Sequence, residues 1–220
     1  MQVINLSDKP SLLNQYIKEI RSTTIQKDSM RFRRNIERIG EIMAVEISRV
    51  LTYKDENVKT PLGTATVQVV RDSIVLGTIL RAGLPFHQGF LNMFDNAENA
   101  FLSAYRRAVV GRNGQEKLEI VSEYLAAPRL DGKTLLLVDP MLATGMSMEV
   151  AYKALLSHGK PKHVHLACTI GTRQAIEYLQ QNMPEDTTLW CAAIDPELNE
   201  KKYIVPGLGD AGDLCFGIKL

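Results

Sequence analysis

The stretch LLLVDPMLATGMSMEV, residues 135–150, brings together an acid, a tight turn and several hydroxyl groups. Its apolar start predicts a buried strand, and helical spacing begins at Met146. Between the two, Gly145 lets the backbone come close to a ligand. The free N–H groups at the start of a helix bind phosphate with help from the helix dipole. The stretch therefore predicts a phosphate site at the carboxyl end of a strand, where ligands of open α/β sheets gather.

Three side chains of this turn extend the hypothesis. Thr144 and Ser147 offer hydroxyl donors to a phosphate, and Asp139 at the strand end can accept from sugar hydroxyls. The turn is not a Walker A motif, because no Gly-Lys-Ser/Thr follows. Taken alone, it fits equally well a plain connection in which Asp139 and Ser147 only cap the helix.

An arginine follows a second apolar run. Arg81 comes directly after 74-IVLGTIL-80 and before Ala82-Gly83, at the start of a predicted helix. The planar fork of a guanidinium at a strand end suits a diphosphate. Taken alone, Arg81 is better explained as a surface arginine whose stem lies over its helix.

The stretch YIVPGLGDAGDLCFG, residues 203–217, is the most specific segment of the chain. Pro206, Gly207 and Gly209 predict an irregular backbone that exposes N–H and C=O groups. Such groups could read the polar edge of a planar ligand. They also fit a glycine-rich loop that closes the edge of the sheet.

Four segments together resemble a known family. VDPMLATGMS (138–147) closely resembles the phosphoribosyl-pyrophosphate (PRPP) motif of type I phosphoribosyltransferases, in the form VDPMLATGGS of uracil phosphoribosyltransferases. ILRAG (79–83) resembles the family's PILRAG, and AYRR (104–107) resembles its MYR before a flexible loop. Residues 203–217 resemble its signature YIxPGLGDAGD…FG. The order is preserved over most of the chain, although the segment 28–51 fits the family loosely.

The resemblance implies a role for each of these residues. Arg81 and Arg106 would bind the diphosphate of PRPP, the 143–147 turn the 5′-phosphate, and Asp139 the ribose. The implied catalytic residues are Arg81, Arg106 and Asp210. The implied PRPP site consists of Arg81, Arg106, Asp139, Pro140, Met141, Leu142, Ala143, Thr144, Gly145, Met146, Ser147 and Asp210. The implied uracil pocket consists of Ile204, Gly209, Asp210 and Ala211.

The implied activity is the pentosyl transfer uracil + PRPP → UMP + diphosphate, a step of pyrimidine salvage. A rigid backbone edge would distinguish uracil from cytosine, because an inverted partner leaves buried polar groups unpaired at about 1–3 kcal/mol each. Mg²⁺ is the implied cofactor, held mainly through PRPP, so no dedicated metal ligands are expected. The family also implies a homodimer or higher oligomer and makes GTP a candidate effector. Two alternatives stay open: a phosphoribosyltransferase for another base, and a catalytically weak regulator that senses PRPP or UMP.

The chain departs from the family pattern at several positions. Met146 replaces the second glycine of ATGGS; we expect it to be tolerated as the first residue of a helix. The segment 169-TIGTRQA-175 replaces an Ala-Pro-Glu-Gly-like turn, and we expect its Arg173 to pair with Glu177 along the helix. Thr78 and Leu214 replace a proline and a basic residue.

The elements that must position these residues indicate an α/β fold. Apolar runs alternate with helical patterns, which predicts a mostly parallel sheet with helices on both faces. The implied type I phosphoribosyltransferase fold adds an N-terminal helical segment, a hairpin and a C-terminal base-binding hood. The predicted strands are 74–80, 134–138, 164–170 and 188–194. The predicted helices are 11–23, 28–51, 84–94, 146–158 and 172–182, with a hairpin over 57–70. Residues 107–117 have the character of an exposed loop, and 203–220 hold little helix or strand pattern.

Length and composition predict one soluble domain. We divide the 220 residues into an N-terminal arm (1–70), a PRPP-binding core (71–195) and a uracil-binding hood (196–220). The net charge of +1 gives no general attraction to nucleic acid, and the basic cluster RFRR (31–34) lies on an amphipathic helix. The lack of a long apolar run or a secretory signal predicts a cytoplasmic protein without membrane contact. Three scattered cysteines predict buried free thiols.

Overall fold

The computed structural model describes residues 1–103, 105–110, 116–121 and 124–219, and for the two middle ranges it describes the backbone alone. A central eight-stranded sheet has the order β1-β12-β11-β9-β4-β5-β8, with β10 paired to β11 beside this path. Neighbouring strands are parallel except β5 and β8. The strands are β1 (Gln2–Asn5), β4 (Ile74–Leu80), β5 (Glu98–Ser103), β8 (Leu125–Ala126), β9 (Thr134–Val138), β10 (Met141–Leu142), β11 (His163–Thr172) and β12 (Thr188–Asp195). The predicted mostly parallel α/β sheet is confirmed.

The central strands are apolar along their length because helices cover both faces of the sheet. All residues of β9 are buried, as are nearly all of β4 and β11. The register aligns Val138 with Thr78 on one side and with Ala167 on the other. The carboxyl ends of β4, β9 and β11 therefore meet at one edge of the sheet.

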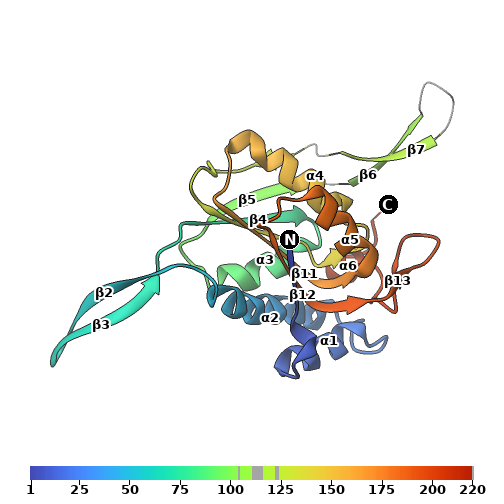
Figure 1. The fold of residues 1–220 in the computed structure, drawn as a ribbon. Coiled ribbons are helices and arrows are strands. Elements are labelled where there is room, and N and C mark those ends of the chain that lie inside the picture. Colours follow the sequence, from blue (N-terminus) through green and yellow to red (C-terminus); the bar gives the residue numbers. More distant parts are fainter. Residues whose placement is uncertain (104, 111–115, 122–123, 220) are drawn as a thin grey trace.

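Two layers of helices enclose this sheet (Figure 1). Helices α1, α2 and α3 pack in one core cluster with Leu76, Leu136 and Trp190. Helices α4 and α5 pack in the other with Leu135 and Leu166. The helices are α1 (Leu12–Arg21), α2 (Ser29–Ser48), α3 (Gly83–Leu91), α4 (Met146–Leu155), α5 (Arg173–Asn182) and α6 (Ala211–Phe216), with 3-10 turns η1 (Leu6–Asp8) and η2 (Leu156–His158). The five helices predicted from the sequence are confirmed, with shifted ends.

Three antiparallel pairs stand outside the central sheet. They are β2 (Tyr53–Thr60) with β3 (Gly63–Val70), β6 (Tyr105–Val110) with β7 (Glu116–Val121), and β13 (Glu197–Leu198) with β14 (Ile204–Val205). The hairpin β2–β3 projects far from the body of the protein (Figure 1). It confirms the hairpin predicted over 57–70 and begins a few residues earlier.

The loop predicted over 107–117 is wrong in part. Residues 107–110 and 116–117 belong to β6 and β7, in a register that pairs Arg107 with Glu119. Hydrogen bonds between the two backbones define such a ribbon, so it can form even where apolar and polar residues do not alternate regularly. Residues 111–115 lie outside the described residues.

The sequence pattern also missed α6 and β5. Asp210 caps α6 by accepting a hydrogen bond from the backbone N–H of Asp213 at 3.0 Å, which starts a helix within a glycine-rich segment. The prediction of buried free thiols is confirmed for all three cysteines. Among the described helices, none is long and apolar enough to cross a membrane.

Candidate active site

A cavity of about 810 Å³ opens where the carboxyl ends of β4 and β9 meet. One wall comes from residues 79–82 and from the segment that follows β9, including Asp139. A second part of the lining comes from residues 201–204 and 209–212. The structure therefore brings together most of the residues that the sequence singled out: Arg81, Asp139, Met141, Leu142, Ala143, Thr144, Gly145, Ser147, Ile204, Gly209, Asp210 and Ala211.

Three of the predicted site residues are not among those that line this cavity. Pro140 is buried, and its carbonyl accepts hydrogen bonds from Thr169 of β11. Met146 lies on the outer side of the turn with 37% of its surface exposed. The backbone of Arg106 lies in β6, but its side chain lies outside the described residues.

The turn between β9 and α4 has the geometry expected of an anion site. Gly145 precedes α4 with φ +81° and ψ −19°, a left-handed conformation that favours glycine. Met146 is the first residue of α4, and no described non-glycine residue of this turn has a positive φ. The expectation that Met146 lies in the first turn of a helix is confirmed, and its effect on ligand binding stays a prediction. The first N–H groups of a helix have no partner within it, and Ser147 and Met148 of the first turn of α4 line the cavity.

Two buried threonines of β11 fasten this turn from behind. Thr169 Oγ1 donates to the carbonyl of Pro140, and Thr172 Oγ1 donates to the carbonyl of Ala143 at 2.7 Å. Both side chains are fully buried. Sequence reasoning missed these positioning residues; the signal was a pair of hydroxyls inside an otherwise apolar strand end.

Asp139 lies at the floor of the cavity with little access to solvent. The only hydrogen bond that the structure gives its carboxylate comes from the backbone N–H of Met141, at 3.4 Å. Burial raises the pKa of Asp139 to about 7, although the Met141 N–H opposes this rise. A carboxylate in this state has oxygens free to accept hydrogen bonds from a hydroxylated ligand.

Replacing Asp139 by asparagine is expected to stabilise the protein more at pH 8 than at pH 5. A folded-state pKa above the unfolded value means that the folded chain binds more protons, so this carboxyl destabilises the fold increasingly as the pH rises from about 4 to about 7. The difference in unfolding free energy between Asp139→Asn and wild type should grow by on the order of 2 kcal/mol from pH 5 to pH 8. Urea unfolding at both pH values measures it.

Asp131→Asn is the matched control for this experiment. The hydrogen bond from Arg129 lowers the pKa of exposed Asp131, so its replacement should bring no gain at pH 8. A stability difference for Asp139→Asn that does not change with pH would contradict the assigned pKa.

Positive charge gathers along the lining of this cavity. Arg81, Lys201, Lys202 and Lys219 all line the cavity. Lys219 Nζ lies 2.9 Å from Asp210 Oδ2, and Arg81 Nη2 lies 3.4 Å from Asp213 Oδ1. Burial alone would raise the pKa of Asp210, but the hydrogen bonds from Lys219 and the Asp213 N–H lower it below its usual value. Sequence reasoning missed the lysines because they lie outside the motif positions.

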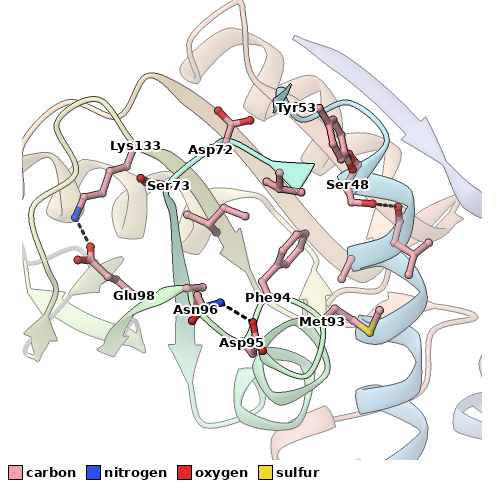
Figure 2. Close-up of a pocket in the computed structure, with 15 residues that line it drawn as sticks. Ser48, Tyr53, Asp72, Ser73, Met93, Phe94, Asp95, Asn96, Glu98 and Lys133 are labelled. Carbon is pink, nitrogen blue, oxygen red and sulfur yellow. Dashed lines mark hydrogen bonds and ion pairs between the residues drawn. The ribbon is translucent and has the colours of Figure 1, made fainter. Parts of the chain in front are cut away.

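A second cavity, of about 570 Å³, lies at the opposite edge of the sheet (Figure 2). Its lining includes the carboxylates of Asp72, Asp95 and Glu98, near the amino ends of β4 and β5. Lys133 also lines it and pairs with Glu98 (Figure 2). This excess of acid over base repels an anionic ligand, so the first cavity suits a phosphate better than the second.

The arginines of the basic cluster RFRR make contacts with neighbouring groups of the fold. Arg31 pairs with Glu19 at 2.9 Å, and Arg34 pairs with Glu37 at 2.5 Å. Arg33 donates to the carbonyl of Cys215 at 2.5 Å, which ties α2 to α6. These arginines serve contacts within the fold.

Residues 7–218 match the family model of uracil phosphoribosyltransferases. The chain belongs to this family. A uracil phosphoribosyltransferase of Porphyromonas gingivalis is 56% identical over 220 residues, which cover 100% of both chains. One of Methanothermobacter thermautotrophicus is 38% identical over 192 residues, covering 86% of this chain and 85% of the relative.

Solved structures share the fold of this chain. The AQ2163 protein of Aquifex aeolicus superposes with a TM-score of 0.84 and 26% identity over 100% of both chains. An adenine phosphoribosyl transferase of Trypanosoma brucei superposes with a TM-score of 0.54 over 94% of this chain and 87% of its own, and at 11% identity it shares the fold alone. The predicted type I phosphoribosyltransferase fold is confirmed.

Arg173, one of the departures from the uracil phosphoribosyltransferase pattern, does not make the contact that we expected. Among the described residues, Arg173 forms no ion pair with Glu177, so the predicted pairing is wrong. Arg173 is exposed at the first position of α5 and lines a small cavity with Asn5 and Asp8. It lies outside the lining of the main cavity, so it adds no charge to the phosphate turn.

Proposed function

We propose that this protein transfers the phosphoribosyl group of PRPP to N1 of uracil, giving UMP and diphosphate. One observation carries the proposal: the helix-start turn after β9 and residues 204 and 209–212 line a single cavity of about 810 Å³. A phosphate at the first part of this lining and a base at the second would be joined by one ribose. Membership of the uracil phosphoribosyltransferase family supports uracil as the base.

The two walls suit different parts of the substrates. Thr144, Gly145 and Ser147 would hold the 5′-phosphate through hydroxyl and backbone donors, and Asp139 would accept from the ribose hydroxyls. On the other wall, backbone groups of Ile204, Gly209 and Ala211 would read the uracil edge. Gly209 lines the cavity with φ +97°, and a Cβ atom there would meet no other atom within 4 Å, so there is open space beside its Cα atom.

The chemical demand of the reaction is electrostatic, because diphosphate departs with its negative charge. Arg81 and Arg106 would stabilise that charge, since guanidinium groups aimed at a leaving group lower the barrier. Asp139 and Asp210 both line the cavity and fit a Mg²⁺ ion that takes most of its ligands from PRPP and water. In the described part of the chain, no group of three or more His, Cys, Asp or Glu side chains is placed to hold a metal by itself. Bound there, Mg²⁺ would neutralise charge on the diphosphate.

Uracil must lose its N1 proton as the new bond forms. None of the described residues that line the cavity is a histidine. His87 and His165 are buried elsewhere, and burial lowers both of their pKa values. The lowered pKa of Asp210 keeps it charged at neutral pH, so it would act by its charge on the reacting ring rather than as a strong base.

One assay separates the proposed activity from its rivals. Purified protein is incubated with Mg²⁺, PRPP and each of uracil, cytosine, hypoxanthine and orotate, and the nucleotides are quantified. UMP from uracil alone is the expected result. Efficient turnover of another base would make the protein a phosphoribosyltransferase for that base. Binding of UMP or PRPP without turnover would favour the regulator.

Replacing Arg106 by alanine is expected to raise the KM for PRPP by about tenfold or more and to leave the KM for uracil within about twofold. The proposed contact is made to the diphosphate, which uracil lacks. Arg107→Ala is the matched control, because it removes the same charge at the neighbouring position in the chain. Equal increases in both KM values for Arg106→Ala would argue against the assignment.

The proposal includes a homodimer or higher oligomer built from this chain, in the cytoplasm. The projecting hairpin β2–β3 supports it, because its exposed apolar side chains include Val58 at 43%, Leu62 at 100% and Val67 at 46%. The register pairs Val58 with Ala65 and Glu56 with Val67, which puts both valines on one face of the ribbon. The effect of GTP stays a prediction of the family resemblance.

The double substitution Val58→Lys and Val67→Lys is expected to shift the protein to a monomer in sedimentation velocity. Charged side chains on that face oppose its burial against a second copy. The control is Asn57→Lys, on the other face of the ribbon, which should leave the oligomer intact. An unchanged sedimentation coefficient for the double variant would remove this face from the interface.

A further inference from the structure

A buried ion pair fastens the first helix of the chain to the loop that follows β14. Arg21, the last residue of α1, donates to both carboxylate oxygens of Asp195, the last residue of β12, at 2.7 and 2.8 Å. The same Nη1 atom donates to the carbonyl of Gly207 at 2.9 Å. The N–H of Gly207 donates to Asp195 Oδ2 at 2.8 Å. Both backbone groups of Gly207 are therefore held by one ion pair.

The local geometry leaves the Gly207 peptide little freedom. Asp195 has 5% of its surface exposed, and the side chain of Arg21 has 22%. Gly207 has φ +56°, and a Cβ atom there would lie 2.1 Å from the carbonyl oxygen of Ile204. The turn is therefore constrained both by its close approach to Ile204 and by its hydrogen bonds to the ion pair. Ile204 on one side of it and Gly209 on the other both line the main cavity.

The ion pair itself stays outside the cavity. Neither Arg21 nor Asp195 is among the residues that line it. A buried ion pair is weak evidence for a stabilising role, because desolvation offsets much of the attraction. The contact between α1 and α2 is already supported by another bidentate ion pair, in which Arg31 donates to Glu19 at 3.0 Å through two nitrogen atoms. What the Arg21–Asp195 pair adds is the fixed orientation of one peptide in the loop between Ile204 and Gly209.

We propose that Arg21 and Asp195 are positioning residues for base recognition. Through Gly207 they set the orientation of the backbone groups of residues 204–209 that face the base, so the N-terminal helix α1 controls how tightly and how selectively uracil binds. The inference rests on the proposed function, because it assigns this backbone to the uracil side of the cavity.

The test uses Asp195→Asn and Arg21→Lys in the full-length enzyme. The side-chain amide introduced by Asp195→Asn can replace only one of the two carboxylate oxygens as an acceptor. A lysine in place of Arg21 keeps the positive charge but loses the fork that joins Asp195 to the Gly207 carbonyl. Each variant is expected to raise the KM for uracil by about tenfold, to keep the KM for PRPP within about twofold, and to lower the preference for uracil over cytosine.

Glu19→Gln and Arg31→Lys are the matched controls. They weaken a second bidentate ion pair of helix α1, which joins it to α2 and does not contact the loop. Their melting temperatures should fall to a similar extent, while both KM values stay near wild type. If Asp195→Asn does not fold, Arg21→Lys carries the test.

Three outcomes would overturn the inference. They are equal increases in the two KM values, an effect on the melting temperature alone, or the same uracil-specific increase in the control variants. A wild-type protein that makes no UMP would contradict the proposed function itself, whereas normal wild-type turnover with unaffected uracil kinetics in Asp195→Asn and Arg21→Lys would contradict only the positioning role.

Discussion

Replacing Arg81 by alanine is expected to lower kcat/KM for PRPP by a factor of about 10²–10³, the loss typical of one donor to a developing negative charge. Arg81 follows β4 directly and lines the cavity, and 44% of its side chain is exposed. Its nearest acceptor, Asp213 Oδ1, is 3.4 Å away, so the guanidinium is free to turn to a diphosphate. Steady-state kinetics with PRPP varied at saturating uracil measure the loss.

The controls for Arg81 separate charge from geometry. Arg81→Lys keeps the charge but not the planar fork, and its activity should fall between those of wild type and the alanine variant. Arg129→Ala removes an arginine that is paired with Asp131 at 2.6 Å, outside the cavity lining, and should change neither kcat nor KM. A kcat/KM for Arg81→Ala within about threefold of wild type would show that Arg81 has no contact with the reacting diphosphate.

Replacing Gly145 by alanine is expected to raise the KM for PRPP by about five- to thirtyfold, which corresponds to about 1–2 kcal/mol of left-handed strain. Gly145 has φ +81°, and a Cβ atom there would lie 3.0 Å from the carbonyl oxygen of Ala175. The turn must then shift away from α5 and change the direction of the N–H groups at the start of α4. Kinetics with varied PRPP measure the effect, and uracil binding should change little.

Met146→Gly is the matched comparison at the neighbouring position. Met146 already lies in the helix and exposes 37% of its surface, so glycine there restores the common family sequence without changing the turn. Its KM for PRPP should stay within about threefold of wild type. A large gain in PRPP affinity for Met146→Gly would show that the methionine is a handicap and would contradict our interpretation of the turn.

The parts of the site that lie in one short segment could be predicted from the sequence. The strand, turn and helix around Asp139 and Gly145 follow from local patterns of apolar residues, glycine and hydroxyls. The irregular backbone of 206–210 follows in the same way from its glycines and proline, whereas the helix α6 that comes after it was missed. Their meeting in one cavity was predicted by family resemblance, and the parallel register of β4, β9 and β11 gives its physical reason.

The contacts that hold these segments in place could not be predicted. Arg21 and Asp195 are 174 residues apart in the chain, and nothing local to either residue marks the other as its partner. Thr172 reaches the carbonyl of Ala143 across 29 residues for the same reason. The strands β6 and β7 were missed because pairing of the backbone, rather than an apolar pattern, defines them. Supporting contacts of this kind depend on tertiary structure that single-sequence patterns do not encode.

A crystal structure with UMP bound tests the central claim most directly, because UMP carries both the phosphate and the base. We expect its phosphate oxygens within hydrogen-bond distance of the backbone N–H groups of residues 143–147. Its uracil ring should face residues 204 and 209–211, with the ribose hydroxyls at Asp139. UMP bound in the acidic cavity beside Asp72 and Glu98, or in the main cavity with phosphate and base exchanged, would contradict the account.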